Sequence, residues 1–282
     1  MEDPGRPRIR PPAVAGSFYP ADAETLRATV EELLAEAGRA APAARPGPPP
    51  KAVIAPHAGY VYSGPVAAVA FRALAARRTP PDKIVLIGPS HRVPVRGLAL
   101  PGSEMLATPL GVIPIDREGA GAALRLPQVL VQPEAHAREH SLEVELPFLQ
   151  LLFPDAEVLP LVVGGASPEE VAEVLERVWG GEETVVVVSS DLSHYLSYDE
   201  ARAADAATAR QVVALAGALA PDQACGARAI NGLLVAVRRR GLAAELLDLR
   251  NSGDTAGPRD EVVGYGAFGF SEGGVGAPPE AA

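Results

Sequence analysis

The sequence predicts an α/β fold whose sheet has a parallel core. Three apolar segments of strand length each end in proline or serine and reach a histidine within a few residues: KAVIAPHAGYVYS (51–63), KIVLIGPSH (83–91) and TVVVVSSDLSH (184–194). A strand, a helix and a second strand fit into about 40 residues after position 51, which is typical of a βαβ unit. With 282 residues, of which 48% are hydrophobic, the chain can fill the core of one large domain.

The first half of the chain alternates helices with strands. Apolar residues have helical spacing from Leu26 to Leu34 behind Asp22, which is suited to cap a helix, whereas the proline-rich segment 40–50 favours a surface connector. Pro65 is expected to open a helix that follows the first histidine loop. We also expect short strands at 97–100 and 111–115, a long loop at 103–110 that could overhang a site, and a weak helix at 117–126.

The second half continues the same alternation. Residues 133–153 contain good helix formers around Pro147, so we expect a helix that begins at Ser141 and is kinked at Pro147. Further strands are expected at 157–163, 184–190, 245–249 and 262–270, and further helices at 168–179, 198–219 and 226–240. We expect residues 13–271 to form a single domain, residues 1–12 to be flexible, and the tail 272–282 to be disordered.

Charge and composition argue against several classes of protein. A formal net charge of -10 disfavours nucleic acid as a partner, and the basic run from Arg238 to Arg240 lies where a helix is expected to end. No apolar run approaches the ~18 residues of a membrane span, and the N-terminus lacks the apolar core of a signal peptide. We therefore expect a cytoplasmic protein without a membrane partner. Cys225 is the single cysteine, which excludes an intrachain disulfide and fits a reducing compartment.

Three histidines follow expected strands and are candidates for one shared site. In open α/β sheets, ligands bind beyond the carboxyl ends of the strands, so His57, His91 and His194 can converge there. Neutral imidazoles are the commonest metal ligands, and each needs an outer-shell partner for its second ring nitrogen. Asp191, three residues before His194, is a candidate for that role. We therefore predict a metal site at this edge of the sheet.

Cys225 is the fourth candidate for this site. A lone cysteine is often a small buried hydrophobe, but Cys225 directly precedes the first turn of an expected helix. The dipole at a helix N-terminus lowers the pKa of a thiol and favours the thiolate, which is the form that binds metals. Two or three imidazoles with one thiolate suit Fe(II), Zn or Cu, and the spacing does not select among them.

A rival zinc motif occupies residues 136–140. His136, Glu139 and His140 match H-x-x-E-H, a pattern that binds zinc when both imidazoles lie one turn apart on a helix. Because Ser141 is expected to begin the next helix, His136 is expected in the loop before it, although Glu139 and His140 could still reach the pocket. The chain contains no G-x-S-x-G elbow, no Walker A loop and no G-x-G-x-x-G after the first strand.

Nine short segments, taken together, resemble the Memo family, known in bacteria and archaea as AmmeMemoRadiSam system protein B. They occur in order over nearly the whole chain, roughly from residue 13 to residue 270. The segments are VAGSFYPAD, APHAGYVYSGPVA, IGPSHRV, TPLG, EHSLEVELPFLQ, VSSDLSHY, ACG, NSGD and VVGYGAF. The resemblance implies a three-layer αβα sandwich around a mixed, largely parallel sheet, the fold of class III extradiol ring-cleaving dioxygenases, which bind non-haem iron.

The resemblance also implies a set of site residues. The family's metal positions match His57, His91 and Cys225, and its pocket positions match Asp191 and His194. The dioxygenases use a carboxylate as third ligand, whereas the ACG segment supplies a thiol, so ring cleavage does not follow from the resemblance. The family name further implies a pathway link to a radical-SAM protein and to an Ammecr-type domain protein.

These observations support three functional hypotheses. In the first, His57, His91 and Cys225 hold Fe(II), or alternatively Cu, in a dioxygenase-like redox enzyme, with His194, Asp191 and His140 as catalytic residues. In the second, the same pocket binds a peptide or small-molecule ligand without turnover, because a fold does not dictate a function. In the third, the H-x-x-E-H segment supports zinc hydrolysis.

Overall fold

The structure is a computed structural model that describes residues 7–40 and 47–273. Within these residues, nine strands form one sheet in the order β10-β12-β2-β9-β3-β8-β4-β7, with β11 paired to β12, and a smaller sheet has the order β1-β5-β6. The strands are β1 (Ile9–Arg10), β2 (Ala52–Ala55), β3 (Lys83–Pro89), β4 (Leu98–Leu100), β5 (Met105–Thr108), β6 (Gly111–Pro114), β7 (Val129–Val131), β8 (Glu157–Val163), β9 (Thr184–Ser189), β10 (His194–Leu196), β11 (Leu242–Asn251) and β12 (Val262–Glu272). The helices are α1 (Ala23–Ala40), α2 (Tyr60–Ala75), α3 (Arg117–Ala123), α4 (Pro133–Ala137), α5 (Leu146–Leu152), α6 (Pro168–Arg177), α7 (Tyr198–Val213) and α8 (Ala227–Arg240), with 3-10 turns η1 (Glu143–Glu145) and η2 (Ser252–Asp254).

The centre of the large sheet is parallel. Strands β2, β9, β3 and β8 pair in parallel register, and antiparallel pairs flank them where β12 joins β2 and β4 joins β8. These strands are almost wholly buried and apolar, as expected for a parallel sheet covered on both faces. Because parallel neighbours end at the same edge, the segments that follow β2, β9 and β3 leave the sheet side by side.

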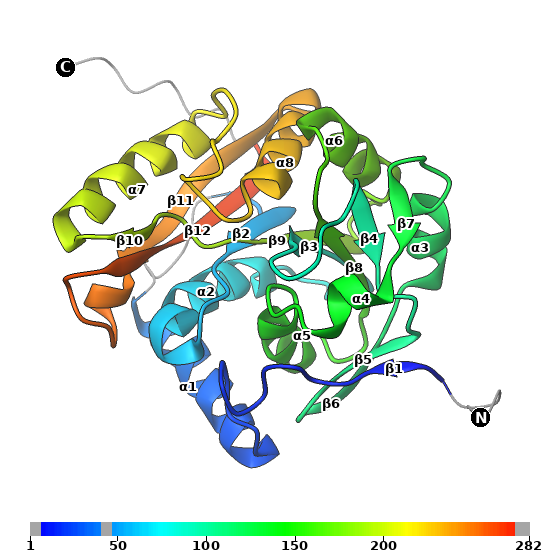
Figure 1. The fold of residues 1–282 in the computed structure, drawn as a ribbon, viewed down its shortest axis with the longest axis horizontal. Helices are drawn as coiled ribbons and strands as arrows, with labels where there is room; N and C mark the ends of the chain where they lie inside the picture. The colour runs from blue at the N-terminus through cyan, green and yellow to red at the C-terminus, as the bar shows by residue number, and fades with distance from the viewer. Residues whose placement is uncertain (1–6, 41–46, 274–282) are drawn as a thin grey trace.

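Helices cover both faces of this sheet. Along β3, Ile84 and Leu86 pack into one core with α1, α2 and α5, whereas Val85 and Ile87 pack into a second core with α6, α7 and α8. In Figure 1 the first set of helices lies below the sheet and the second set lies above it. The prediction of a three-layer α/β sandwich around a mixed, largely parallel sheet is confirmed.

Two prolines lie in helices differently from the prediction. Helix α2 begins at Tyr60, so Pro65 lies inside its second turn and does not open it. Pro147 lies in the first turn of α5, where a missing N–H costs no helical hydrogen bond, and no helix begins at Ser141. The expected kink at Pro147 was therefore wrong.

Other boundaries also differ from the expectation. Residues 105–108 of the expected long loop form β5, which pairs with β1 and β6 and does not overhang the pocket described below. Helix α7 ends at Val213, six residues before the expected end. Strand β12 continues to Glu272, and the rest of the expected disordered tail, residues 274–282, lies outside the described residues. None of the helices in the described part of the chain combines the length and hydropathy needed to cross a bilayer.

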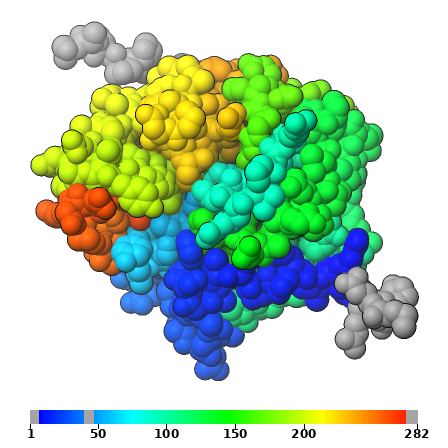
Figure 2. All heavy atoms as spheres, in the orientation of Figure 1, coloured from blue at the N-terminus to red at the C-terminus, as the bar shows by residue number. Residues whose placement is uncertain are grey.

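The N-terminal segment is attached to the body of the protein. Arg10, in β1, is buried and forms an ion pair with Glu143, which also accepts hydrogen bonds from the backbone N–H groups of Ala13 and Val14. Figure 2 shows this segment, in dark blue, lying along the green surface of the middle of the chain. Residues 1–12 were expected to be flexible, but the segment around Arg10 packs against the body of the protein, and the first six residues lie outside the described part.

Candidate metal centre

The ends of three strands deliver polar side chains to one pocket. His57 follows β2 after a single proline, His91 lies two residues beyond β3, and Asp191 lies two residues beyond β9. His194 begins β10, which is paired with β12. The pocket has a volume of about 600 Å³ and is lined by His57, His91, Arg92, His140, Asp191, His194, Tyr195, Pro221, Asp222 and Cys225.

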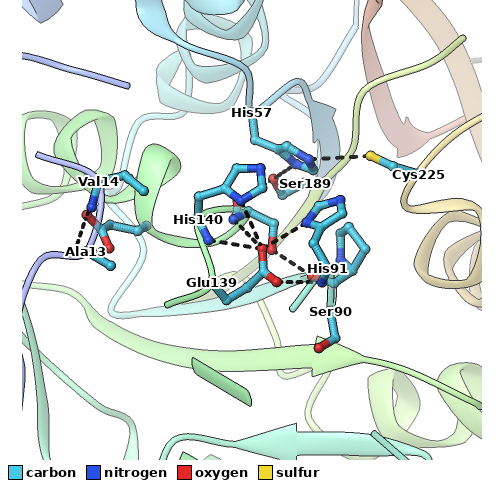
Figure 3. A network of polar contacts seen from close by, with 12 residues as sticks. Ala13, Val14, His57, Ser90, His91, Glu139, His140, Ser189 and Cys225 are labelled. Carbon is cyan, nitrogen blue, oxygen red and sulfur yellow. Dashed lines mark hydrogen bonds and ion pairs between the residues drawn. The ribbon is translucent and has the colours of Figure 1, made fainter. Parts of the chain in front are cut away.

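His57 is almost completely buried, with 1% of its surface exposed. Its backbone N–H donates to Asp191 Oδ1 at 2.8 Å, and its Nδ1 lies 2.7 Å from Ser189 Oγ. Its other ring nitrogen, Nε2, lies 3.4 Å from Cys225 Sγ (Figure 3). Both ring nitrogens are therefore oriented by neighbours, one toward the sheet and one toward the thiol.

Glu139 forms hydrogen bonds with His91 and with the backbone at His140. Its Oε1 lies 2.9 Å from His91 Nδ1, its Oε2 accepts the backbone N–H of His91, and Oε1 also accepts the backbone N–H groups of His140 and Ser141. Burial acts to raise the pKa of Glu139, but the hydrogen bonds and the charge of His91 outweigh it and lower the pKa to about 2. Because the carboxylate is ionised, Nδ1 of His91 donates to it and Nε2 keeps its lone pair.

His140 completes a cluster with the other two histidines. One ligand atom from each of His57, His91 and His140 lies within 4.8 Å of the others. The ring centroids of His91 and His140 are 4.7 Å apart, and the His57 ring meets them edge-on at 5.3 and 5.4 Å (Figure 3). His140 Nδ1 lies 3.3 Å from Glu139 Oε1 but is buried without a hydrogen bond in the described part of the chain. An unpaired, buried imidazole nitrogen in such a cluster fits a metal ligand.

Burial favours the neutral form of His57, His140 and His194. Burial, followed by the nearby imidazoles of His140 and His91, lowers the pKa of His57 well below its ordinary value. Burial also lowers the pKa of His140 to about 4, against the opposing charge of Glu139, and lowers the pKa of His194. A neutral imidazole binds a metal ion without first losing a proton, so the lowered pKa values of His57 and His140 favour metal binding at neutral pH.

Asp191 and His194 lie in the same pocket with different surroundings. Burial raises the pKa of Asp191 to about 7, although the backbone N–H of His57 acts in the opposite direction. His194 Nδ1 lies 2.8 Å from the Leu192 carbonyl oxygen, which can only accept, so His194 is protonated there and has its lone pair on Nε2.

Cys225 lies in the same pocket, beside His57. It directly precedes Gly226, the cap of α8, as predicted, and its Sγ accepts the backbone N–H of Asp191 at 3.3 Å. The helix N-terminus was expected to lower the pKa of this thiol, but in the metal-free protein burial and then the charge of Asp191 raise the pKa of Cys225 to about 12. His57, His91 and His140 form the group of mutually close ligand atoms, and the assignment of Cys225 as a metal ligand stays a prediction.

His136 lies away from the pocket. It is in the short helix α4, where the sequence predicted a loop, and its Nε2 lies 2.8 Å from the Ala99 carbonyl oxygen. His140 follows after α4 has ended, so the two imidazoles of H-x-x-E-H are not one turn apart on one helix. The arrangement that the zinc-hydrolase hypothesis requires is absent from this segment.

The family to which the chain belongs follows from sequence comparison. The family model described as "Memo-like protein" matches residues 10–268, which include every residue of the pocket. The chain belongs to the Memo-like protein family. A MEMO1 family protein of Methanopyrus kandleri is 37% identical, over 94% of this chain and 99% of its own length. MEMO1 family proteins of Methanothermobacter thermautotrophicus and Aquifex aeolicus are 36% and 34% identical, over 91% and 92% of this chain and 98% and 97% of their own lengths.

The structure of this Memo-like pocket adds three residues that the sequence did not assign to these roles. His140 was expected among the catalytic residues and lies in the cluster, while Glu139 and Ser189 orient His91 and His57. Glu139 was expected only as part of H-x-x-E-H and as a residue that could reach the pocket, and no contact with His91 was predicted for it. A signal for its actual role exists in the sequence, because an acidic residue next to a pocket histidine is a common outer-shell partner.

Proposed function

We propose that this protein binds one transition-metal ion through His57, His91 and His140 and acts as a dioxygenase-like redox enzyme on a small organic ligand. The observation that carries the proposal is the approach of three imidazoles from separate parts of the chain, with one ligand atom of each within 4.8 Å of the others. Imidazole donors suit Fe, Cu and Zn. Fe(II) is the proposed metal, with Cu as the redox-active alternative.

The outer shell of the cluster supports metal binding. Glu139 accepts from His91 Nδ1 and Ser189 contacts His57 Nδ1, which leaves Nε2 of both rings for a metal. A bound Fe(II) would supply one-electron redox chemistry with dioxygen. Cys225 has its thiol next to His57, where it can join the ligands only after losing its proton.

Asp191 and His194 are the proposed proton carriers. The pKa of Asp191, raised to about 7, lies close to neutral pH, where a carboxyl group can both give and take a proton. His194, neutral and with its lone pair on Nε2, can accept a proton from a ligand in the pocket. Arg92 and Tyr195 line the same pocket and supply a cation and an aromatic ring for holding that ligand.

Elemental analysis after anaerobic purification, together with a dioxygen-consumption assay, tests the proposal. We expect about one iron per chain in the wild type and loss of iron in His91→Ala. His136→Gln is the matched control, since it removes a histidine outside the pocket and keeps an N–H donor for the Ala99 carbonyl. Its iron content should equal that of the wild type.

Three results would redirect the proposal. Full iron occupancy in His91→Ala would exclude the three-histidine site. Bound metal without dioxygen consumption under any tested ligand would favour a binding protein without turnover. Zinc that disappears in His136→Gln would favour the hydrolase hypothesis.

A further inference from the structure

Glu145 is a carboxyl group with no exposed surface, located in η1 between the cluster histidine His140 and helix α5. Its Oε1 lies 2.8 Å from Ser189 Oγ, and its Oε2 has no hydrogen-bond partner in the described part of the chain. No ion pair to Glu145 occurs among the described residues, and the charged group that acts on its pKa is Asp191, which is also acidic. A buried carboxylate without a counter-charge is strongly disfavoured, so this environment favours the protonated acid.

The hydrogen bonds of Ser189 lead to the same conclusion. Its hydroxyl oxygen lies 2.6 Å from the Ser141 carbonyl oxygen, 2.7 Å from His57 Nδ1 and 2.8 Å from Glu145 Oε1. A hydroxyl donates one hydrogen and accepts up to two. Since the carbonyl can only accept, it takes the serine hydrogen. His57 Nδ1 and Glu145 Oε1 must then each donate a hydrogen to Ser189.

We infer that Glu145 acts as a neutral acid and positioning residue, which through Ser189 keeps the proton of His57 on Nδ1 and leaves the Nε2 lone pair for the pocket. The order of donors is Glu145 to Ser189, Ser189 to the Ser141 carbonyl, and His57 to Ser189. Burial raises the pKa of Glu145 well above its ordinary value, although the contact with Ser189 acts in the opposite direction, and this agrees with the hydrogen count.

The opposite side of the His57 ring is consistent with this tautomer. Nε2 lies 3.4 Å from Cys225 Sγ, and burial holds Cys225 as a thiol by raising its pKa to about 12. An S–H group can donate to an imidazole lone pair, but not to a protonated nitrogen. The lone pair is thus covered by a weak donor that an incoming metal can displace. The role of this tautomer in metal binding rests on the proposed function, whereas the assignment of the tautomer does not.

The tautomer can be measured on the metal-free protein. In full-length protein labelled with ¹⁵N-histidine, long-range ¹H–¹⁵N spectra distinguish the two neutral tautomers, and His57→Gln identifies the His57 signals. We expect the Nδ1-protonated pattern in the wild type and in Glu145→Gln, because the glutamine amide can still donate to Ser189. Ser189→Ala should produce a mixture of tautomers. An Nε2-protonated His57 in the wild type, or an unchanged pattern in Ser189→Ala, would overturn the inference.

Infrared difference spectra between the wild type and Glu145→Gln test the neutral acid directly. We expect the carbonyl band of a protonated carboxylic acid at pH 8, lost in Glu145→Gln; a carboxylate band in its place would contradict the inference. Fe(II) titration adds a functional readout, with affinity about 10–100-fold weaker in Ser189→Ala and restored in Ser189→Thr, which keeps the hydroxyl. If the wild type binds no metal while His57 shows the expected tautomer, the proposed function fails and the inference stands.

Discussion

The ion pair of Glu143 offers a quantitative test of how the N-terminal segment is held. Glu143 has 1% of its surface exposed and accepts from Arg10, from the backbone N–H groups of Ala13 and Val14, and from the Tyr19 hydroxyl. In Glu143→Gln the charge is lost, and the new NH₂ group faces donors. Arg10, with 8% of its surface exposed, then lacks its counter-charge.

The expected cost of Glu143→Gln is about 3–5 kcal/mol in the free energy of unfolding, the usual penalty for leaving one partner of a buried ion pair unpaired. At about 2–4 °C per kcal/mol for a chain of this size, the melting temperature should fall by roughly 10 °C. Urea unfolding followed by far-UV circular dichroism measures both the midpoint and the slope. The slope should stay unchanged, since the core that unfolds is the same.

Tyr19→Phe is the matched control for this measurement. It removes one donor to Glu143 and leaves the carboxylate, the guanidinium and both backbone donors in place. We expect a loss of about 1.5–3 kcal/mol, the range for one hydrogen bond to a charged group. If the free energy of unfolding of Glu143→Gln lies within about 1 kcal/mol of that of the wild type, the ion pair does not hold the N-terminal segment and the reasoning is refuted.

Three further predictions concern His136, Cys225 and Gly226. The pKa of His136 is lowered from 6.5 to about 4, chiefly by burial, so the protein should lose stability as the pH falls through that range. His136→Gln should remove on the order of 3 kcal/mol of this acid dependence. Parallel curves of stability against pH for the two proteins would contradict this prediction. Because burial raises the pKa of Cys225 to about 12, iodoacetamide should modify the metal-free protein at pH 7.5 at least about 100 times more slowly than it modifies free cysteine. A mass-spectrometric time course measures this rate. A rate equal to that of free cysteine would refute the prediction. Gly226→Ala would place a Cβ 2.7 Å from Ser190 Cβ, so it should cost about 1–3 kcal/mol in urea unfolding, and a neutral result would show that α8 can shift.

The sequence predicted the parts of the fold that depend on local composition. Strands β3 and β9 are continuous apolar runs bounded by proline or serine, and their parallel pairing places the following residues at one edge. For this reason the convergence of His57, His91 and His194 on one pocket followed from the order of strands and histidines alone.

The sequence could not predict features that depend on burial by distant segments. The helix that follows Cys225 was visible, but the burial that raises the pKa of its thiol arises from surroundings such as Asp191, 34 residues away. Arg10 likewise looked like part of a loose, charged terminus until its partner Glu143 was located. Proline is common in the first turn of a helix, so the position of Pro65 did not reveal that the helix begins five residues earlier, at Tyr60, with Gly59 as its cap.

Crystals soaked anaerobically with Fe(II) and measured at the iron absorption edge test the central claim most directly. We predict one anomalous peak bounded by ring nitrogens of His57, His91 and His140, with the Cys225 sulfur next to it and His136 far from it. A fully soaked crystal with no peak at the three imidazoles, or with its only peak at His136, would contradict the account.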